Sequence, residues 1–371
     1  MMRWIPLPVA ALALVSHSYG SVPGFRSSEP VPGLRAEVSM GADTTIVSEE
    51  VSFQVGSRTV PGTLTRPAKG SGPGLLLFAG SGPTDRDWNS PLLQGKNGSA
   101  KQLAEALAAR GIVSLRFDKA FSGQNRSLPI TELTLDTYVA EARAALGLLR
   151  SRPEVDPSRL FIAGHSEGGI HVTRLALAEG HAVRGVLLLA APGRPMKDLL
   201  LSQIESGFRD DAKLAPEEVE ARMKPIRQGL ADFLAGKDVD PQAISDAPQI
   251  RMIFMSLTAK PVAALGRALI SFDPEAEAPK IEVPVLVLQG GKDIQVDQSE
   301  AQRLVAALRG AKRDVTYHLS PDASHVLKHE PKAIPDLLAD RAAVQATYSA
   351  DGIPIDGDVV AALTAWIRGK S

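Results

Sequence analysis

Short runs of consecutive apolar residues alternate along this chain with longer segments whose apolar positions recur at helical spacing. A continuous apolar run is typical of a strand buried in a parallel sheet, and a period of 3.6 is typical of a helix packed on that sheet. The runs that predict strands are residues 75–78, 112–117, 160–165, 186–190, 283–288 and 314–319. The segments that predict helices are residues 100–109, 134–150, 167–179, 298–308 and 357–369.

Residues 46–66 have a different pattern, because apolar and polar residues alternate there. This alternation predicts two antiparallel strands, 50–55 and 60–65, joined by a turn at Gly56-Ser57. In the rest of the chain, strands that alternate with helices require right-handed parallel crossovers. The predicted fold class is therefore α/β, with a mostly parallel central sheet flanked by helices.

The strand–helix alternation stops between about Pro195 and Asp273, where helices near 198–208, 216–235 and 241–270 follow one another. Ligand crevices in α/β sheets lie at the carboxyl ends of the strands, so we interpret this helical insertion as a lid over those ends. A packing subdomain without a role at the site is the alternative. The predicted organisation is a core in two parts, residues 45–194 and 274–371, with a lid at residues 195–273.

The first 20 residues have the pattern of an export signal. Arg3 supplies a positive start, residues 5–15 form a short apolar core, and Ser18-Tyr19-Gly20 offers small residues for cleavage near Gly20. The apolar core is too short to span a bilayer comfortably. Residues 21–44 are rich in Pro, Gly and Ser and suit a flexible linker better than a buried helix. We therefore expect an exported protein, either periplasmic or secreted.

The composition is that of a globular protein, with 44% hydrophobic and 22% charged residues among 371. The formal net charge of -1, without long runs of one sign, gives no electrostatic case for binding nucleic acid or a membrane surface. A pocket must therefore select the substrate, which we expect to be a small molecule. The chain contains no cysteine, which excludes disulfides, thiolate metal sites and lipid attachment through cysteine.

The stretch Gly164-His165-Ser166-Glu167-Gly168 carries the strongest chemical signal in the chain. It is a G-x-S-x-G sequence between a predicted strand and a predicted helix, where a sharp turn projects the serine hydroxyl. Its glycines permit the close approach of helix and strand. A serine hydroxyl becomes a good nucleophile only when an oriented base takes its proton. Ser166 is the predicted nucleophile, and a chance Gly/Ser-rich turn is the alternative.

The base and its orienting acid are expected where other strands end at the same edge of the sheet. His325 follows the last predicted strand and is the predicted general base, with His329 in reserve. Asp293 follows the strand at 283–288 and is the predicted acid. A turn or helix cap is the alternative role for this aspartate, but Asp297, just ahead of the next helix, suits capping better.

A tetrahedral intermediate also needs hydrogen-bond donors for its oxyanion. The predicted donors are the backbone N–H of Glu167 and that of Ser81, or of its neighbour Gly82, in the loop after strand 75–78. In the same loop, Asp85-Arg86-Asp87 either fixes the geometry through ion pairs or is solvated. The loop lacks the remaining residues of a phosphate-binding motif, and the chemistry predicted here needs no metal and no cofactor.

The order of elements, the G-x-S-x-G stretch, Gly290-Gly291-Lys292-Asp293 and the loop histidine resemble the α/β-hydrolase fold family, including its chain order of Ser, Asp, His. Residues 80–87 and Leu115-Arg116-Phe117-Asp118-Lys119 resemble a branch of exported bacterial esterases related to serine aminopeptidases and dienelactone hydrolases. The resemblance covers about residues 45–370. Two positions depart from that branch: residues 120–123 replace its usual Arg-Gly-x-Gly, and Ala79-Gly80 replaces its His-Gly.

These signals together predict a serine hydrolase that cleaves carboxylic esters through an acyl-enzyme. An exported aminopeptidase-like amide hydrolase, a thioesterase and a non-catalytic protein that binds a small ligand are the alternatives. Residues 252–255, Met-Ile-Phe-Met, are candidates for an apolar acyl pocket in the insertion, with core packing as the other interpretation.

Overall fold

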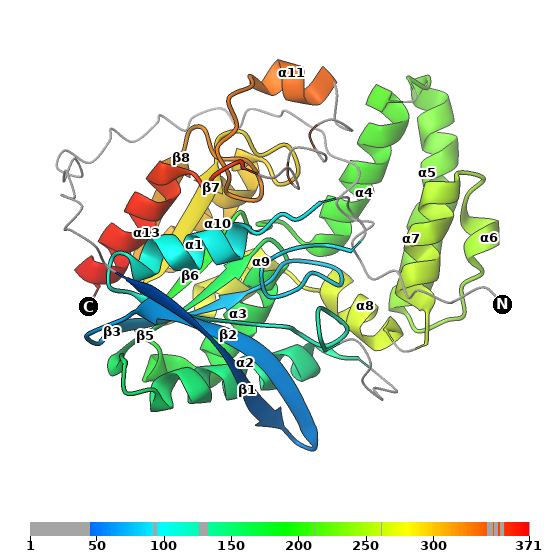
Figure 1. The fold of residues 1–371 in the computed structure, drawn as a ribbon. Helices are drawn as coiled ribbons and strands as arrows, with labels where there is room; N and C mark the ends of the chain where they lie inside the picture. Colours follow the sequence, from blue (N-terminus) through cyan, green and yellow to red (C-terminus); the bar gives the residue numbers. More distant parts are fainter. Residues whose placement is uncertain are drawn as a thin grey trace.

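The computed structural model describes residues 45–370 apart from residues 92–94, 126–132, 212, 261, 340–343, 345–347 and 349–351. The predicted export signal and linker, residues 1–20 and 21–44, lie outside the described residues. The centre of the molecule is a sheet of eight strands in the order β1-β2-β4-β3-β5-β6-β7-β8 (Figure 1).

The sheet combines one antiparallel edge with a parallel body. β1 and β2 form a hairpin, β2 pairs antiparallel with β4, and the pairings that join β3 to β8 are all parallel. This arrangement confirms the predicted hairpin and the mostly parallel α/β sheet. The strands are β1 (Ile46–Val55), β2 (Arg58–Pro67), β3 (Gly72–Phe78), β4 (Val113–Phe117), β5 (Val155–His165), β6 (Gly185–Leu189), β7 (Val285–Gly290) and β8 (Val315–Ser320).

Alternate residues of the central strands pack against different helices, because successive side chains of a strand point to opposite faces. Leu75 and Leu77 of β3 belong to the cluster formed with α1 and α13. Leu76 and Phe78 belong to the cluster formed with α2, α3 and α10. Figure 1 shows these two layers on either side of the sheet. The flanking helices are α1 (Ser99–Ala108), α2 (Leu135–Ser151), α3 (Gly168–Glu179), α10 (Gln298–Gly310) and α13 (Gly357–Gly369).

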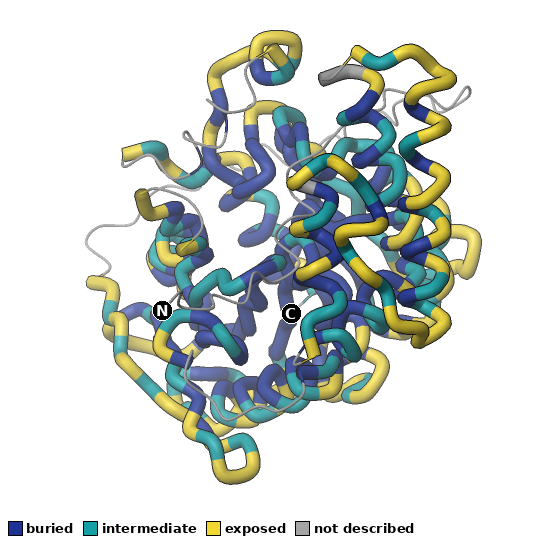
Figure 2. The backbone as a smooth tube through the Cα atoms, turned by 90° about the vertical axis from the view of Figure 1, so that its right-hand side faces the viewer, coloured by how far each residue is buried: buried dark blue, intermediate teal, exposed yellow. Residues whose placement is uncertain are grey.

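A group of helices connects β6 to β7 and stands at one side of the sheet (Figure 1). Its inward stretches are buried and its outward stretches are exposed (Figure 2). The elements are α4 (Met196–Ser206), a π-helical turn (Gly207–Asp211), α5 (Pro216–Leu234), α6 (Pro241–Ile244), α7 (Pro248–Thr258), α8 (Ala263–Ile270), α9 (Pro274–Glu277) and a 3-10 turn (Ala278–Lys280).

The single helix predicted over 241–270 is wrong, because this segment forms three helices. Pro248 is one physical cause: it occupies the first position of α7, where a missing N–H costs nothing, but it cannot continue a helix from before. Ala247, directly before Pro248, is accordingly extended. No single helix in the described ranges is both long and apolar enough to cross a membrane; α7 and α8 reach that length and composition only together, across a bend of 113°.

Candidate active site

Ser166 lies on the turn between β5 and α3 in a left-handed backbone conformation, with φ of +53°. For a residue with a side chain this conformation costs on the order of 1 kcal/mol or more. The surroundings enforce it through close packing of backbone on backbone. A Cβ on Gly164 would lie 2.2 Å from the carbonyl oxygen of Gly168, and a Cβ on Gly168 would lie 2.8 Å from that of Ala79. Both glycines are therefore required for the turn that projects the serine.

Asp293 follows β7 and is nearly inaccessible, yet its carboxylate is fully hydrogen-bonded. Its Oδ1 accepts from the backbone N–H groups of Gln295 and Val296 at 2.8 and 2.9 Å. Its Oδ2 accepts from the Gln289 amide at 3.1 Å and lies 2.8 Å from Nδ1 of His325. The Asp293 carboxylate therefore accepts the proton on Nδ1 of His325, which leaves Nε2 to act as the base.

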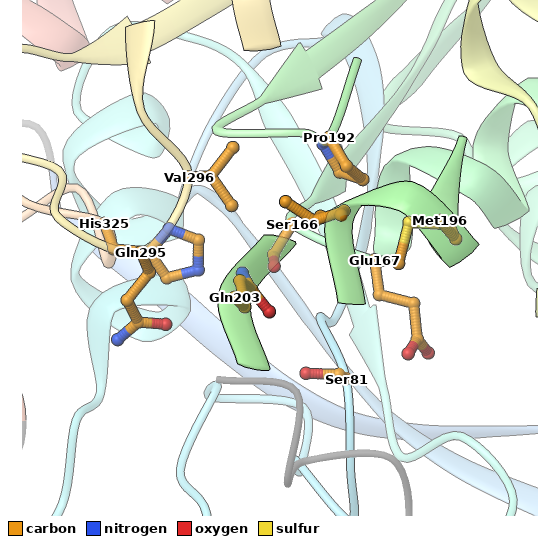
Figure 3. A pocket seen from close by; sticks show the side chains of 10 residues that line it. Ser81, Ser166, Glu167, Pro192, Met196, Gln203, Gln295, Val296 and His325 are labelled. Atoms are coloured by element: carbon orange, nitrogen blue, oxygen red, sulfur yellow. The ribbon is translucent and has the colours of Figure 1, made fainter. Parts of the chain in front are cut away.

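Ser166 and His325 line the same small pocket, which has a volume of about 50 Å³. The His325 ring and the Ser166 hydroxyl face each other across it (Figure 3). The structure thus brings together the side chains predicted as nucleophile and base, with Asp293 directly behind the imidazole. The rest of the described lining comes from Ser81, Glu167, Pro192, Met196, Leu199, Gln203, Gln295 and Val296.

Ser81 and Glu167, the residues predicted to supply oxyanion donors, both line this pocket. Among the hydrogen bonds of the described residues, neither backbone N–H has an acceptor. Two backbone donors without an acceptor among the described residues thus belong to residues that line the pocket with Ser166, and a developing oxyanion requires such donors.

Buried charges at the end of β4 anchor the loop that carries Ser81. Lys119 is fully enclosed, and its ammonium donates a hydrogen bond to the carbonyl of Gly80. The guanidinium of Arg86 binds the Asp118 carboxylate with contacts of 2.8 and 3.1 Å, and the Arg86 backbone N–H donates to the same carboxylate at 2.8 Å. The chain is therefore held in place both before Ser81, at Gly80, and after it, at Arg86.

The segment Asp85-Arg86-Asp87 is held by ion pairs rather than solvated, but its partners lie outside the segment. Besides Asp118, Arg86 contacts Glu50 at 2.6 Å. Asp87 contacts Arg116 at 3.1 Å. These pairs connect the loop after β3 to strands β1 and β4.

The side chain of Glu167 belongs to a buried charge network beneath the pocket. Burial alone would raise its pKa, but the hydrogen bond from His171 and the charge of Lys119 lower it below its ordinary value. Burial lowers the pKa of His171 more than its bond to Glu167 raises it. At neutral pH Glu167 is therefore ionised, and a neutral His171 donates to it from Nε2 at 3.4 Å.

His165 contributes to the site, although no role was predicted for it from the sequence. Its Nε2 donates to the backbone carbonyl of His325 at 2.7 Å, and its ring stacks on Trp88 with centroids 4.5 Å apart. Burial, assisted by the charge of His325, lowers the pKa of His165 to about 3, so the ring is neutral and donates. Its position beside Ser166 at the end of a strand was the available signal.

The other residues considered from the sequence are not among the described residues of the pocket lining. His329 contacts Asp356, at the start of α13, at 3.1 Å and is not among the described residues of the pocket lining. Asp297 caps α10 by accepting a hydrogen bond from the Ser299 N–H at 2.7 Å, as predicted. Residues 252–255 do not line the pocket either: Ile253 and Phe254 pack in the core of the insertion, while the two methionines that flank them are exposed.

The chain is similar to several known proteins. A family model described as serine aminopeptidase, S33, matches residues 94–332. Esterase EstD of Thermotoga maritima is 28% identical over 272 residues, which cover 72% of this chain but only 58% of EstD. The protein Rv2307c of Mycobacterium tuberculosis is 26% identical over 301 residues, or 81% of this chain and 78% of Rv2307c. The solved structure of DcsB in complex with its substrate analogue aligns over 87% of this chain and 99% of that chain, with 14% identity and a TM-score of 0.50.

Proposed function

The chain belongs to the α/β-hydrolase family described as serine aminopeptidase, S33, and we propose that it cleaves carboxylic esters through an acyl-enzyme. The observation that carries this proposal is the 2.8 Å contact from Asp293 to His325 at a pocket that His325 shares with Ser166. The strained conformation of Ser166 supports it, since a binding protein has no use for such a turn. The similarity to EstD, which is named an esterase, supports the choice of ester.

In the proposed acylation, Oγ of Ser166 attacks the ester carbonyl carbon while Nε2 of His325 takes the hydroxyl proton. Asp293 stabilises the imidazolium that forms. The carbonyl oxygen becomes negative and accepts hydrogen bonds from the N–H groups of Ser81 and Glu167. When the tetrahedral intermediate collapses, the C–O bond to the alcohol breaks, and the alkoxide leaves with the proton from His325.

Deacylation repeats these steps with water in place of the serine hydroxyl. His325 takes a proton from water, and the hydroxide adds to the acyl carbon. The intermediate then expels Oγ of Ser166, which recovers its proton from His325, and the carboxylic acid is released. The site regains its starting protonation state after each turnover.

An amide or peptide is the second candidate substrate, because the family itself is described as serine aminopeptidase. An aminopeptidase site needs an acidic group for the substrate ammonium. Glu167 is the one acidic side chain in the described pocket lining, and His171 and Lys119 already compensate its charge. This arrangement favours the ester.

The test compares Ser166→Ala with the unchanged protein on four probes: a fluorophosphonate, p-nitrophenyl esters of graded chain length, aminoacyl-p-nitroanilides and an acyl thioester. We expect fluorophosphonate labelling and preferential ester hydrolysis, both lost in Ser166→Ala. Labelling that survives the substitution would place the nucleophile elsewhere. Faster cleavage of anilides or of the thioester would assign the site to those substrates, and a protein that neither labels nor turns over would be a binding protein.

We propose that the helices from α4 to α9 act as a lid. Three residues of the pocket lining, Met196, Leu199 and Gln203, come from α4. Hydrogen exchange measured with and without a covalently attached fluorophosphonate tests this role. Slower exchange in α4 after attachment is expected, whereas unchanged exchange throughout the insertion would assign it to packing.

We also propose that the protein is exported, on the pattern of its first 20 residues. Fractionation of a bacterial host and intact-mass measurement test this directly. The expected product is a periplasmic or secreted chain cleaved near Gly20, and a cytoplasmic chain that retains Met1 would refute export.

A further inference from the structure

The side-chain amide of Gln203 faces the pocket and forms no hydrogen bond with another described residue. Only 8% of the residue is exposed, and its side chain lines the pocket together with Ser166 and His325. Among the described residues its amide has no hydrogen-bond partner. Figure 3 shows this side chain extending into the space where the Ser166 hydroxyl points. A carboxamide can donate two hydrogen bonds and accept two, so this capacity is available to a ligand.

The helix that carries Gln203 otherwise gives the pocket an apolar wall. Met196, Leu199 and Gln203 follow one another at spacings of three and four residues, which places them on one face of α4. Pro192 and Val296 extend the apolar lining beyond α4. Gln203 is therefore the place on this wall where a substrate can form a directed hydrogen bond.

Water that enters the empty pocket can solvate the Gln203 amide, and a substrate that fills the pocket must displace it. An apolar substrate leaves the amide buried and unpaired, whereas a substrate with a suitably placed oxygen or nitrogen replaces the lost hydrogen bonds. Sites with a buried hydrogen-bonding group reject analogues that lack the complementary group much more strongly than apolar pockets reject an extra methylene. The amide thus discriminates between substrates of equal size.

We infer that Gln203 is a specificity-determining residue, which selects esters that carry a hydrogen-bonding oxygen or nitrogen within a few bonds of the scissile carbonyl. This inference rests on the proposed ester hydrolysis and narrows its substrate class. Polar groups in the acyl chain and in the alcohol are both compatible with the position of the amide, so both are tested.

The experiment uses pairs of esters in which a methyl group replaces a hydroxyl of similar size. On the acyl side the pair is p-nitrophenyl 3-hydroxybutyrate and 3-methylbutyrate, and on the alcohol side it is 2-hydroxyethyl and propyl butyrate. Each kcat/KM is divided by the rate constant for hydroxide-catalysed hydrolysis of the same ester, which removes intrinsic reactivity. The proteins compared are the unchanged chain, Gln203→Met and Gln228→Met.

Methionine keeps the length of glutamine without its amide, so Gln203→Met isolates the hydrogen-bonding group. Gln228→Met makes the same change at an exposed position of α5, away from the pocket lining, and serves as the matched control. We expect the unchanged protein to prefer the hydroxylated ester of at least one pair by about tenfold, equivalent to about 1.4 kcal/mol. Gln203→Met should lose this preference while fluorophosphonate labelling continues, and Gln228→Met should keep it.

If the unchanged protein had equal normalised values of kcat/KM for the two esters of each pair, the inference would be overturned, and no variant would be needed to show it. A preference that persists in Gln203→Met would overturn it as well. Both results leave ester hydrolysis intact and are therefore distinct from failure of the proposed function, in which no ester is cleaved.

Discussion

At the scale of single residues, the two oxygens of Asp293 have separate tasks, and this separation predicts the effect of Asp293→Asn. Two backbone N–H groups occupy Oδ1, so the amide oxygen of asparagine would take that place and its NH₂ would face His325. The imidazole would then carry its proton on Nε2 and could not accept one from Ser166. We expect kcat for p-nitrophenyl esters to fall by roughly 10⁴-fold, as measured by steady-state kinetics.

Asp297→Asn is the control for that substitution. Asp297 lies four residues further on and caps α10 through one accepted hydrogen bond, which asparagine provides equally well. Its kcat should stay within about twofold of the unchanged protein, since caps of the two types are nearly equivalent. Equal losses in both variants would mean that the loop, and not the tautomer of His325, sets the rate.

His165 is the basis of a second prediction at the scale of single residues, because its hydrogen bond holds the backbone of His325, the predicted general base. His165→Phe keeps an aromatic ring against Trp88 but removes the donor to the His325 carbonyl, whereas His165→Gln restores an N–H donor. A small displacement of a catalytic group can cost up to about 100-fold in rate. We expect a loss of kcat of about tenfold or more in His165→Phe, partial recovery in His165→Gln, and little change of KM in either. Equal rates for the two variants would show that the donor is dispensable.

The residues that the sequence could indicate are those whose place along the chain determines their place in space. Ser166, Asp293 and His325 each follow a strand, and parallel strands deliver their carboxyl ends to one edge. Gln203 could not be found in this way, because its access to the pocket depends on how α4 is oriented against the sheet. The contact from Lys119 to Gly80 joins two loops and likewise has no periodic signal.

At the scale of elements, β3, β5 and α3 can approach one another closely only because glycine has no side chain where they meet. In Gly168→Ala the new methyl would lie 2.8 Å from the carbonyl oxygens of both Phe78 and Ala79, which belong to backbone that cannot turn aside. We expect a loss of about 1–3 kcal/mol in the free energy of unfolding, measured by urea denaturation, together with reduced ester hydrolysis.

Gly147→Ala is the matched control, since Gly147 lies inside α2 and a Cβ there meets nothing within 4 Å. Replacing a helical glycine with alanine should raise the free energy of unfolding by roughly 0.5–1 kcal/mol and leave the activity unchanged. If both variants shifted in the same direction, close packing at the elbow would not be the cause.

The loop after β3 gives the next prediction, because Lys119 holds the residue directly before Ser81. Lys119→Met keeps the length of the side chain but removes the hydrogen bond to the Gly80 carbonyl. The Ser81 N–H should then be less well placed for the oxyanion, with kcat reduced by about 10- to 100-fold and KM changed little. Lys101→Met, on the exposed face of α1, should leave both parameters unaltered. A rise in KM at constant kcat would contradict a role in the oxyanion site.

The helical insertion shows how far periodicity determines an element. Residues 216–235 were predicted as one helix and form α5 over nearly the same range. Residues 241–270 are more apolar but bend sharply between α7 and α8, so that both helices pack on the same core. The spacing of apolar residues predicts that each piece is helical. The positions of the breaks depend on the tertiary packing of the pieces and have no such signal.

At the scale of the whole molecule, the parallel order of β3, β5, β7 and β8 explains why distant segments meet. The loops after these four strands carry Ser81, Ser166, Asp293 and His325 respectively. Strand direction follows from the strand–helix alternation, so this convergence could be predicted from the sequence. The depth of the pocket and the identity of its outer wall could not, because they depend on where α4 packs.

The burial of His165 in the folded molecule predicts how stability depends on pH. Its pKa falls from 6.5 to about 3 on folding, so below 6.5 the unfolded chain binds a proton that the folded protein does not. Stability should therefore decrease as pH falls from 6.5 toward 3 and be independent of this group above 6.5. Urea denaturation at a series of pH values measures how steeply the free energy of unfolding depends on pH. Near pH 5, His165→Phe should reduce this slope by up to about 1.4 kcal/mol per pH unit. The two proteins should have parallel stability curves near pH 8, where neither state carries the proton. Parallel curves near pH 5 as well would mean that His165 takes up its proton in the folded state.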